Sequence, residues 1–454
     1  MKAAAARLEK SAFNYWLLLA LAAACLVASI LTGVASGIVT AFPWPASRWM
    51  SLRALRPAHT LFALAWVIFG SAACVGLFAA RNGVGRLWTS RLQIVFFNAF
   101  LFGSLVAAAR GSYSGREYVT WPPAMSLPLI AGLVLVLANI VAAWKPIHGH
   151  SPEAAWLLST GAVLLPAGLV EQYLYLLPRI AADPGRDLVV QWHALDTLIA
   201  AWCLLLYGVG VLLAPAGTRA LRGGWLFALA MIGILLDFGH HNYPSPQPYL
   251  VKFVSFTASM LAAVSFLRHA RAFRRTTRSS DSLPGLLRQI EIWTLFAVGS
   301  GILLAVPYVN LYLHGTYAIV GHTMGAMIGV NSLLLFAAGF AWSGFEARRR
   351  AMLVRGTSAS LAVFCVALFG LGVGRGILRL DRDFAGWHEL LRPFYVLIPI
   401  SAIPLSVALL GLAVDLLRCC LRAMRALTAD DLSDVGAALL PGPRAEDAEA
   451  VTPR

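Results

Sequence analysis

The sequence predicts an all-α protein, a polytopic membrane bundle of about twelve transmembrane helices. Two observations lead to this fold class. Hydrophobic residues make up 59% of the 454 residues and charged residues only 13%, which gives a mean hydropathy of +0.73. One apolar run follows another, each of roughly the 20 residues that a helix needs to cross the hydrocarbon core. Runs of this length favour helices, because each helix satisfies its own backbone hydrogen bonds in lipid.

Each apolar run defines one expected helix. In chain order the expected spans are residues 14–41, 58–80, 87–110, 124–145, 154–177, 188–214, 223–243, 249–268, 286–312, 316–345, 359–380 and 392–417. Residues 14–417 therefore form the membrane domain. Residues 1–13 precede it, and residues 418–454 are expected to be a disordered tail, because that stretch is rich in polar and charged residues.

The net charge of +15 is distributed asymmetrically. Lysine and arginine cluster before the first span and in every second loop after it, which places them on one side of the membrane. The positive-inside rule then predicts that both termini of this multi-pass membrane protein are cytoplasmic. The basic residues are explained by topology and by contact with the anionic lipid bilayer, so no nucleic-acid partner is expected.

Six of the ten histidines fall at one depth of the membrane. Because successive spans alternate in direction, these histidines all lie in the outer leaflet, on four different helices. They are His59, His193, His240, His241, His314 and His322. A single histidine in a membrane is usually explained by a hydrogen bond to a neighbouring helix. The shared depth of six indicates a metal or cofactor site instead.

The adjacent pair His240 and His241 has a special requirement. Neighbouring residues on a helix point about 100° apart, so both rings can face one metal only at a helix end. Gly239 and Pro244 predict such an end. With His193 from another span, the pair would form a three-imidazole site with open coordination positions.

His322 and Met324 lie two residues apart on one predicted helix, so their side chains point to opposite flanks. Neutral imidazole and thioether are both ligands of haem iron, and a methionine partner raises the reduction potential. The simpler interpretation of Met324 is ordinary core packing.

These motifs together resemble the large, catalytic subunit of bacterial respiratory nitric oxide reductase, a member of the haem-copper oxidase superfamily. The matching stretches are RPAHTLFALAWVIFG, GREYVTWP, QWHALDTL, GHHNY and VNLYLHGTYAIVGHTMGAMIG. They occur in the family's order and on the expected helices, over residues 14–417. Each motif alone is weak, whereas the ordered set is highly specific.

The resemblance implies two haems b. His59 would be an axial ligand of a low-spin haem b, with Met324 at the position where the family has its second histidine. His322 would be the proximal ligand of a high-spin haem b. His314, in the HGT stretch, matches a residue that we assign to hydrogen bonding near the haem propionates. Glu117, in the GREY stretch, matches a position associated with a calcium ion.

The resemblance also implies that His193, His240 and His241 hold a non-haem metal, which is iron in the reductases and copper in the oxidases. We expect iron. Two carboxylates accompany these ligands. Asp196 shares a helix face with His193, and Asp237 shares one with the histidine pair, so both are candidate ligands or proton donors. The alternative is that each aspartate only orients an imidazole ring.

Two departures from the family pattern matter. Met324 replaces a histidine, so the alternative to a His–Met haem is a haem that is five-coordinate or absent. Reductases of the best-known type carry a glutamate four residues after the histidine of the sixth span, where Thr197 stands. A second family glutamate, on the eighth span, has no counterpart. No chain of acidic residues and lysines from the cytoplasm is obvious, and Glu171 and Lys252 are isolated candidates for such a path. Proton uptake from the outside is therefore the simpler expectation.

The sequence favours nitric oxide over oxygen as the substrate. Oxygen-reducing relatives carry a tyrosine beside the non-haem metal, at one of two positions that are Thr197 and Ile234 here. No long soluble extension precedes the first span, so a separate membrane-anchored cytochrome c subunit is the expected electron donor. The alternatives are a divergent oxygen-reducing oxidase, a haem-binding relative without catalysis, and a secondary transporter.

Overall fold

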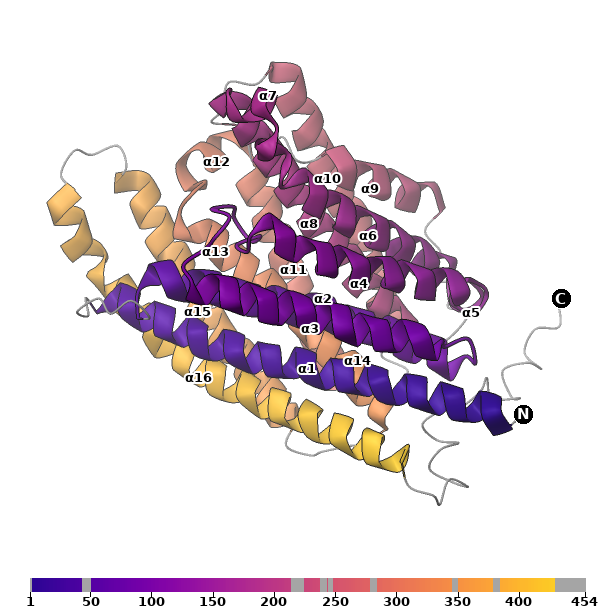
Figure 1. Ribbon diagram of the computed structural model, residues 1–454. Helices are drawn as coiled ribbons and strands as arrows, with labels where there is room; N and C mark the ends of the chain where they lie inside the picture. Colours follow the sequence, from indigo (N-terminus) through magenta and orange to yellow (C-terminus); the bar gives the residue numbers. More distant parts are fainter. Residues whose placement is uncertain are drawn as a thin grey trace.

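The computed structural model is helical throughout the residues that it describes, which are 2–42, 50–213, 224–236, 243, 248–277, 284–344, 350–378 and 384–428 (Figure 1). Ten helices in this part of the chain are long and apolar enough to cross a membrane. The other two predicted spans correspond to α9 and to the apolar first half of α10, which are shorter. The all-α membrane bundle that the sequence predicts is confirmed.

The elements follow one another with short connections. They are α1 Lys2–Ala41, α2 Leu52–Arg81, α3 Leu87–Ala109, α4 Pro123–Ala142, α5 Trp144–His150, α6 Pro152–Glu171, η1 Leu174–Leu176, α7 Pro178–Ala181, α8 Pro184–Leu212, α9 Gly224–Leu236, α10 Tyr249–Thr277, α11 Pro284–Ala305, α12 Pro307–Leu313, α13 Tyr317–Met324, η4 Gly325–Ser332, α14 Leu333–Ser343, α15 Arg350–Leu378 and α16 Phe384–Ala426. The helix α16 therefore includes the first residues of the predicted tail.

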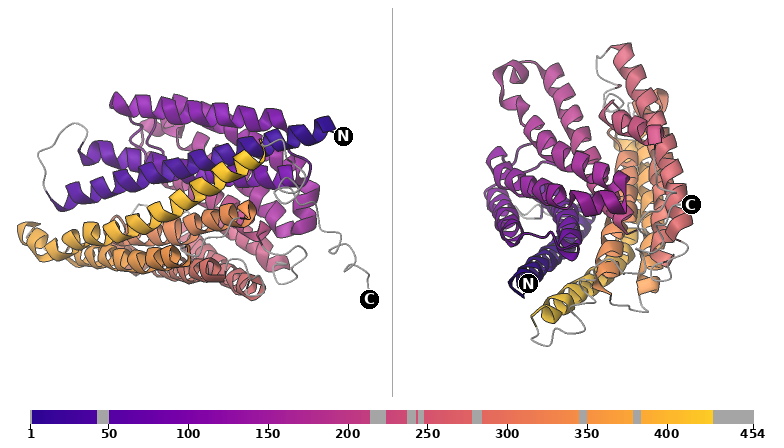
Figure 2. Two further views of the ribbon diagram at one scale, coloured as in Figure 1. Left: turned by 90° about the horizontal axis from the view of Figure 1, so that it is seen from below. Right: turned by 90° about the vertical axis from the view of Figure 1, so that its right-hand side faces the viewer.

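The first and last helices close the bundle. α1 packs along both α2 and α16 (Figures 1 and 2). One large apolar cluster fills the space between the helices. Its largest fully buried side chains include Trp66 and Phe69 of α2, so α2 is the central helix of this half of the bundle.

Glycines set the spacing of α6 and α8. A methyl group at Gly161 would lie 2.7 Å from the carbonyl oxygen of Ala201, and one at Gly208 would lie 2.6 Å from Leu158 Cγ. The absent side chains let the two backbones approach closely, as is common between membrane helices. This close packing fixes α6 against the helix that carries His193.

The predicted span 286–312 is interrupted in the structure. α11 ends at Ala305 and α12 begins at Pro307, because proline has no N–H to donate and holds the preceding Val306 in extended conformation (φ −65°, ψ 122°). α12 is followed by a turn in which Gly315 has φ +73°. The hydroxyl of Thr316 then accepts a hydrogen bond from the backbone N–H of Ala318 and caps α13.

The predicted span 316–345 is one continuous helical path with a local change of winding. α13 passes into the π-helical segment η4, which passes into α14. π turns inside α-helices are rare and occur frequently at functional sites. This one begins directly after Met324.

Candidate functional site

His59 is held by the first helix. Its Nδ1 donates to the carbonyl oxygen of Ser29, 2.8 Å away, and the Ser29 hydroxyl lies 3.2 Å from the same nitrogen. A carbonyl oxygen only accepts hydrogen bonds, so Nδ1 carries the proton and Nε2 keeps its lone pair. A methyl group at Gly33 would lie 2.9 Å from the ring, so α1 accommodates the imidazole only because this residue is glycine. The ring thus has one nitrogen oriented and one nitrogen available as a ligand.

His322 repeats this arrangement on α13. Its Nδ1 lies 2.9 Å from the Ser300 hydroxyl of α11. That hydroxyl donates to the carbonyl oxygen of Phe296, 2.7 Å away, so it accepts from His322. Gly301 again leaves room, because a methyl group there would lie 3.2 Å from the ring. Nε2 of His322 is therefore also available as a ligand, which fits the donor set that a haem iron requires.

Met324 is the last residue of α13. Its side chain packs against the main core and against a smaller apolar cluster formed by α15 and α16. Leu368 and Leu391 belong to this smaller cluster. Core packing of Met324 is therefore present in the structure, and its ligation of a haem stays a prediction.

His193 contacts a carboxylate from a different helix. Its Nδ1 is hydrogen-bonded to Glu171 Oε1, at the C-terminal end of α6. The hydroxyl of Thr197 lies 3.5 Å from the other oxygen of Glu171 and donates to the carbonyl oxygen of His193, 2.9 Å away. The sequence predicts Glu171 as an isolated residue, whereas the structure pairs it with His193. The one available signal was an acidic residue inside an apolar run, which is costly without a partner.

The predicted acidic residues are only partly within the described chain. Asp196 is buried on α8, at 8% exposure, one turn beyond His193. Asp237, His240 and His241 lie outside the described residues. The three-imidazole site and the roles of both aspartates therefore stay predictions.

The GREY loop between α3 and α4 contacts α8 and α13. Buried Arg116 donates to Gln191 of α8, 2.8 Å away, and pairs with Asp187 of the same helix. Tyr118, in a left-handed conformation at φ +61°, lies beside Thr323 of α13. The loop therefore lies over the helices that carry His193 and His322.

Glu117 forms an ion pair with Arg56 of α2, at 3.2 Å. Calcium prefers six to eight oxygen ligands. Within the described ranges, no three or more acidic, cysteine or histidine side chains are grouped so that they could hold a metal ion. A calcium ion at Glu117 stays a prediction. The ring of His314 packs against Trp192 of α8, with 5.0 Å between ring centroids.

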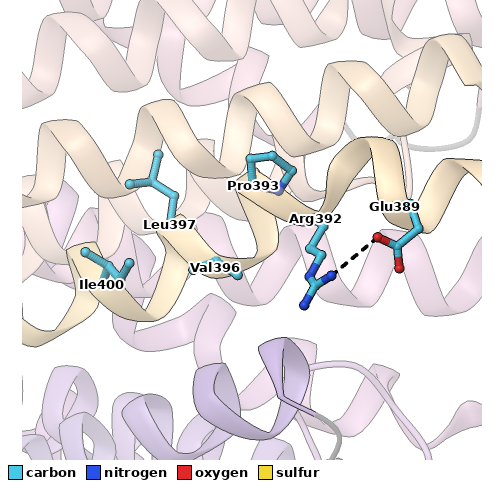
Figure 3. A pocket seen from close by; sticks show the side chains of 6 residues that line it. All are labelled: Glu389, Arg392, Pro393, Val396, Leu397 and Ile400. Carbon is cyan, nitrogen blue, oxygen red and sulfur yellow. Dashed lines mark hydrogen bonds and ion pairs between the residues drawn. The ribbon is translucent and has the colours of Figure 1, made fainter.

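A groove of about 370 Å³ on the outside of α16 is separate from these histidines. Residues from Glu389 to Ile400 of this one helix line it (Figure 3). Its only cation, Arg392, is paired with Glu389 at 3.5 Å. The groove brings no two helices together and holds no candidate ligand.

Residues 14–403 match the family of cytochrome c and quinol oxidase polypeptide I. The chain belongs to this family. The match spans every described histidine discussed above. Membership of this haem-copper oxidase family makes the chain a multi-pass membrane oxidoreductase of the respiratory type. Proteins of this family bind haems and a copper or iron centre, and they receive electrons from partner proteins. It argues against the secondary transporter.

A solved structure of a haem-copper terminal oxidase dimer has the same fold. It aligns with a TM-score of 0.69 over 92% of this chain and 84% of that chain, at 13% sequence identity. At this identity the likeness establishes the fold alone. No curated protein sequence matches this chain.

Proposed function

We propose that this oxidase-family chain is the catalytic subunit of a nitric oxide reductase, which converts two nitric oxide molecules, two protons and two electrons into nitrous oxide and water. The observation that carries the proposal is the environment of position 197. Thr197 stands one turn after His193 and donates to the backbone of its own helix. Oxygen reduction needs a phenol at such a position, to supply an electron and a proton when the O–O bond breaks. Nitric oxide coupling breaks only an N–O bond and needs no such phenol.

The cofactors follow from the oriented imidazoles. A low-spin haem b would be held by His59 and Met324, and a high-spin haem b by His322, with His314 near the propionates. His193, His240 and His241 would hold a non-haem iron. When bound, the high-spin haem and the non-haem metal supply electrons and polarise the nitrogen oxides. Ser29 and Ser300 keep the Nδ1 protons of His59 and His322 in place, so that each Nε2 faces outward from its hydrogen-bonded partner.

The proton requirement points to the carboxylates. Each turnover consumes two protons. Glu171 of α6 is hydrogen-bonded to His193, and Asp196 lies one turn after His193 on α8. Asp237 precedes the predicted histidine pair by one turn. We propose that these side chains carry protons from the outer surface, because the predicted topology places the end of α6 on that side.

The electron donor in this proposal is a membrane-anchored cytochrome c subunit. It would dock on the outer side, near the GREY loop and the first turns of α2 and α8. The same topology places both termini in the cytoplasm of a bacterial cell. Glu117 would contribute to a calcium site if the Arg56 pair opened.

The deciding experiment compares the two gases. The purified protein is assayed anaerobically for nitrous oxide formation from nitric oxide, and separately for oxygen consumption, with the same reduced cytochrome c as donor. We expect one nitrous oxide per two nitric oxides, and loss of that activity in His193→Ala. Oxygen reduction without nitrous oxide formation would establish the divergent-oxidase alternative. Haem binding with neither activity would establish the non-catalytic one.

A further inference from the structure

Of the three described histidines whose Nδ1 partners are known, His193 differs from the others in charge. His59 is held by a backbone carbonyl and His322 by a serine hydroxyl, and both of these partners are neutral. His193 is held by the carboxylate of Glu171. An anionic partner fixes the ring and also strengthens the other ring nitrogen as a metal ligand. His193 is therefore expected to bind a cation more strongly than His59 or His322.

The Glu171 carboxylate lies between His193 and Thr197. Close packing of α6 against α8 sets its distance from His193, and the Thr197 hydroxyl, which donates to the His193 carbonyl oxygen, lies 3.5 Å from its second oxygen. The Glu171 side chain is 23% exposed and the His193 side chain 38% exposed, so water screens the pair only partly. Next to Glu171, buried Gln172 has no hydrogen-bond partner for either amide atom among the described residues. A buried polar group of this kind indicates a bound water or a bound group at the end of α6.

We propose that Glu171 is the positioning residue of His193. It accepts the Nδ1 hydrogen, fixes the tautomer and the ring plane, and leaves Nε2 for the non-haem metal. Glu171 thereby supplies the carboxylate of this site from α6, a helix other than the one that carries the histidine. This inference rests on the metal site proposed above and is independent of which gas is reduced.

The test compares Glu171→Gln with Glu171→Leu, because they separate two roles. Glutamine still accepts the Nδ1 hydrogen, whereas leucine does not. The metal content per haem is measured by elemental analysis after equilibration with a graded series of chelator concentrations. We expect Glu171→Leu to weaken metal binding by about 10- to 100-fold, and Glu171→Gln to weaken it by less than about 10-fold.

Glu153→Gln is the matched control. Glu153 is a buried glutamate at the other end of α6, where the Ser151 hydroxyl donates to it at 2.8 Å. This variant should bind the non-haem metal as the wild type does. The haem content of every variant, measured by its absorption spectrum, shows whether the bundle has folded.

A double variant tests whether Glu171 acts through His193. If it does, Glu171→Leu combined with His193→Ala should bind the metal no more weakly than His193→Ala alone. A further loss in the double variant would overturn the proposal, since Glu171 would then ligate the metal itself. Equal metal loss in Glu171→Gln and Glu171→Leu, or wild-type binding in Glu171→Leu, would overturn it as well.

The failure of this inference is distinguishable from the failure of the proposed function. A wild-type protein that holds the metal but reduces oxygen instead of nitric oxide removes only the gas assignment. A wild-type protein that holds haem and no non-haem metal removes the metal site itself, and the role of Glu171 with it.

Discussion

Tyr118 in the loop between α3 and α4 lies beside Thr323, the residue between His322 and Met324 on α13. The Tyr118 ring also packs near Trp202 of α8, with ring centroids 5.8 Å apart. Burial raises the pKa of Tyr118 to about 12, so the phenol stays protonated under physiological conditions. One loop side chain therefore connects the two helices that carry His193 and His322.

Tyr118→Phe should disturb both stability and the haem environment. Loss of the polar contact between Tyr118 and Thr323 should cost about 1 kcal/mol of unfolding free energy. Because Thr323 lies between the two candidate ligands, the visible absorption bands of the reduced haems should also shift. Tyr113→Phe is the control, since Tyr113 in the same loop donates only to the carbonyl oxygen of Ala108. Unchanged bands in Tyr118→Phe would show that the contact does not influence the haems.

Met324→Ala should abolish the low-spin haem signal in paramagnetic resonance and low-temperature optical spectra, because the thioether ligand is lost. Met324→His should restore a low-spin haem with a lower reduction potential, since imidazole replaces thioether. Met327→Ala, in the adjoining π-helical segment, serves as the control. If Met324→Ala keeps the wild-type spectrum, Met324 is a packing residue.

His240→Ala should remove the non-haem metal and leave both haems. The physical reason is that two imidazoles alone hold the metal much more weakly than three. Elemental analysis and the haem absorption spectrum of the same sample measure the two effects together. His148→Ala, on the short helix α5, is the control. Retention of the metal in His240→Ala would refute the three-histidine site.

Gly372→Ala should force α15 away from α13. A methyl group at Gly372 would lie 2.1 Å from the backbone nitrogen of Ala318, which cannot move without shifting α13. Overpacking of this kind costs typically about 1–3 kcal/mol, so the temperature of haem release in detergent should fall. Gly356→Ala on the same helix is the control, because the nearest atom there is 3.7 Å away. Equal release temperatures in the two variants would contradict the packing argument.

The sequence predicted helices well where lipid imposes a strict rule. A segment in hydrocarbon must satisfy its backbone internally, so an apolar run of sufficient length is a helix whatever its neighbours are. The expected span 87–110 agrees with α3, Leu87–Ala109. The span 286–312 was wrong as one unbroken helix, although Pro307 was visible in the sequence. The residues on both sides of Pro307 are apolar, so hydropathy alone does not show a break. The break arises because the proline interrupts the backbone hydrogen bonding of the helix.

The sequence by itself determined the all-α membrane class and the order of the helices, because helix length follows from the thickness of the bilayer. Only the tertiary structure decided which groups orient those histidines. Ser29 with His59, Ser300 with His322 and Glu171 with His193 are pairs between different helices. Such pairs depend on how far each helix is rotated and how closely it packs, and contacts such as those at Gly161 and Gly208 set both. Hydrophobic periodicity along one helix carries no information about the rotation of the next.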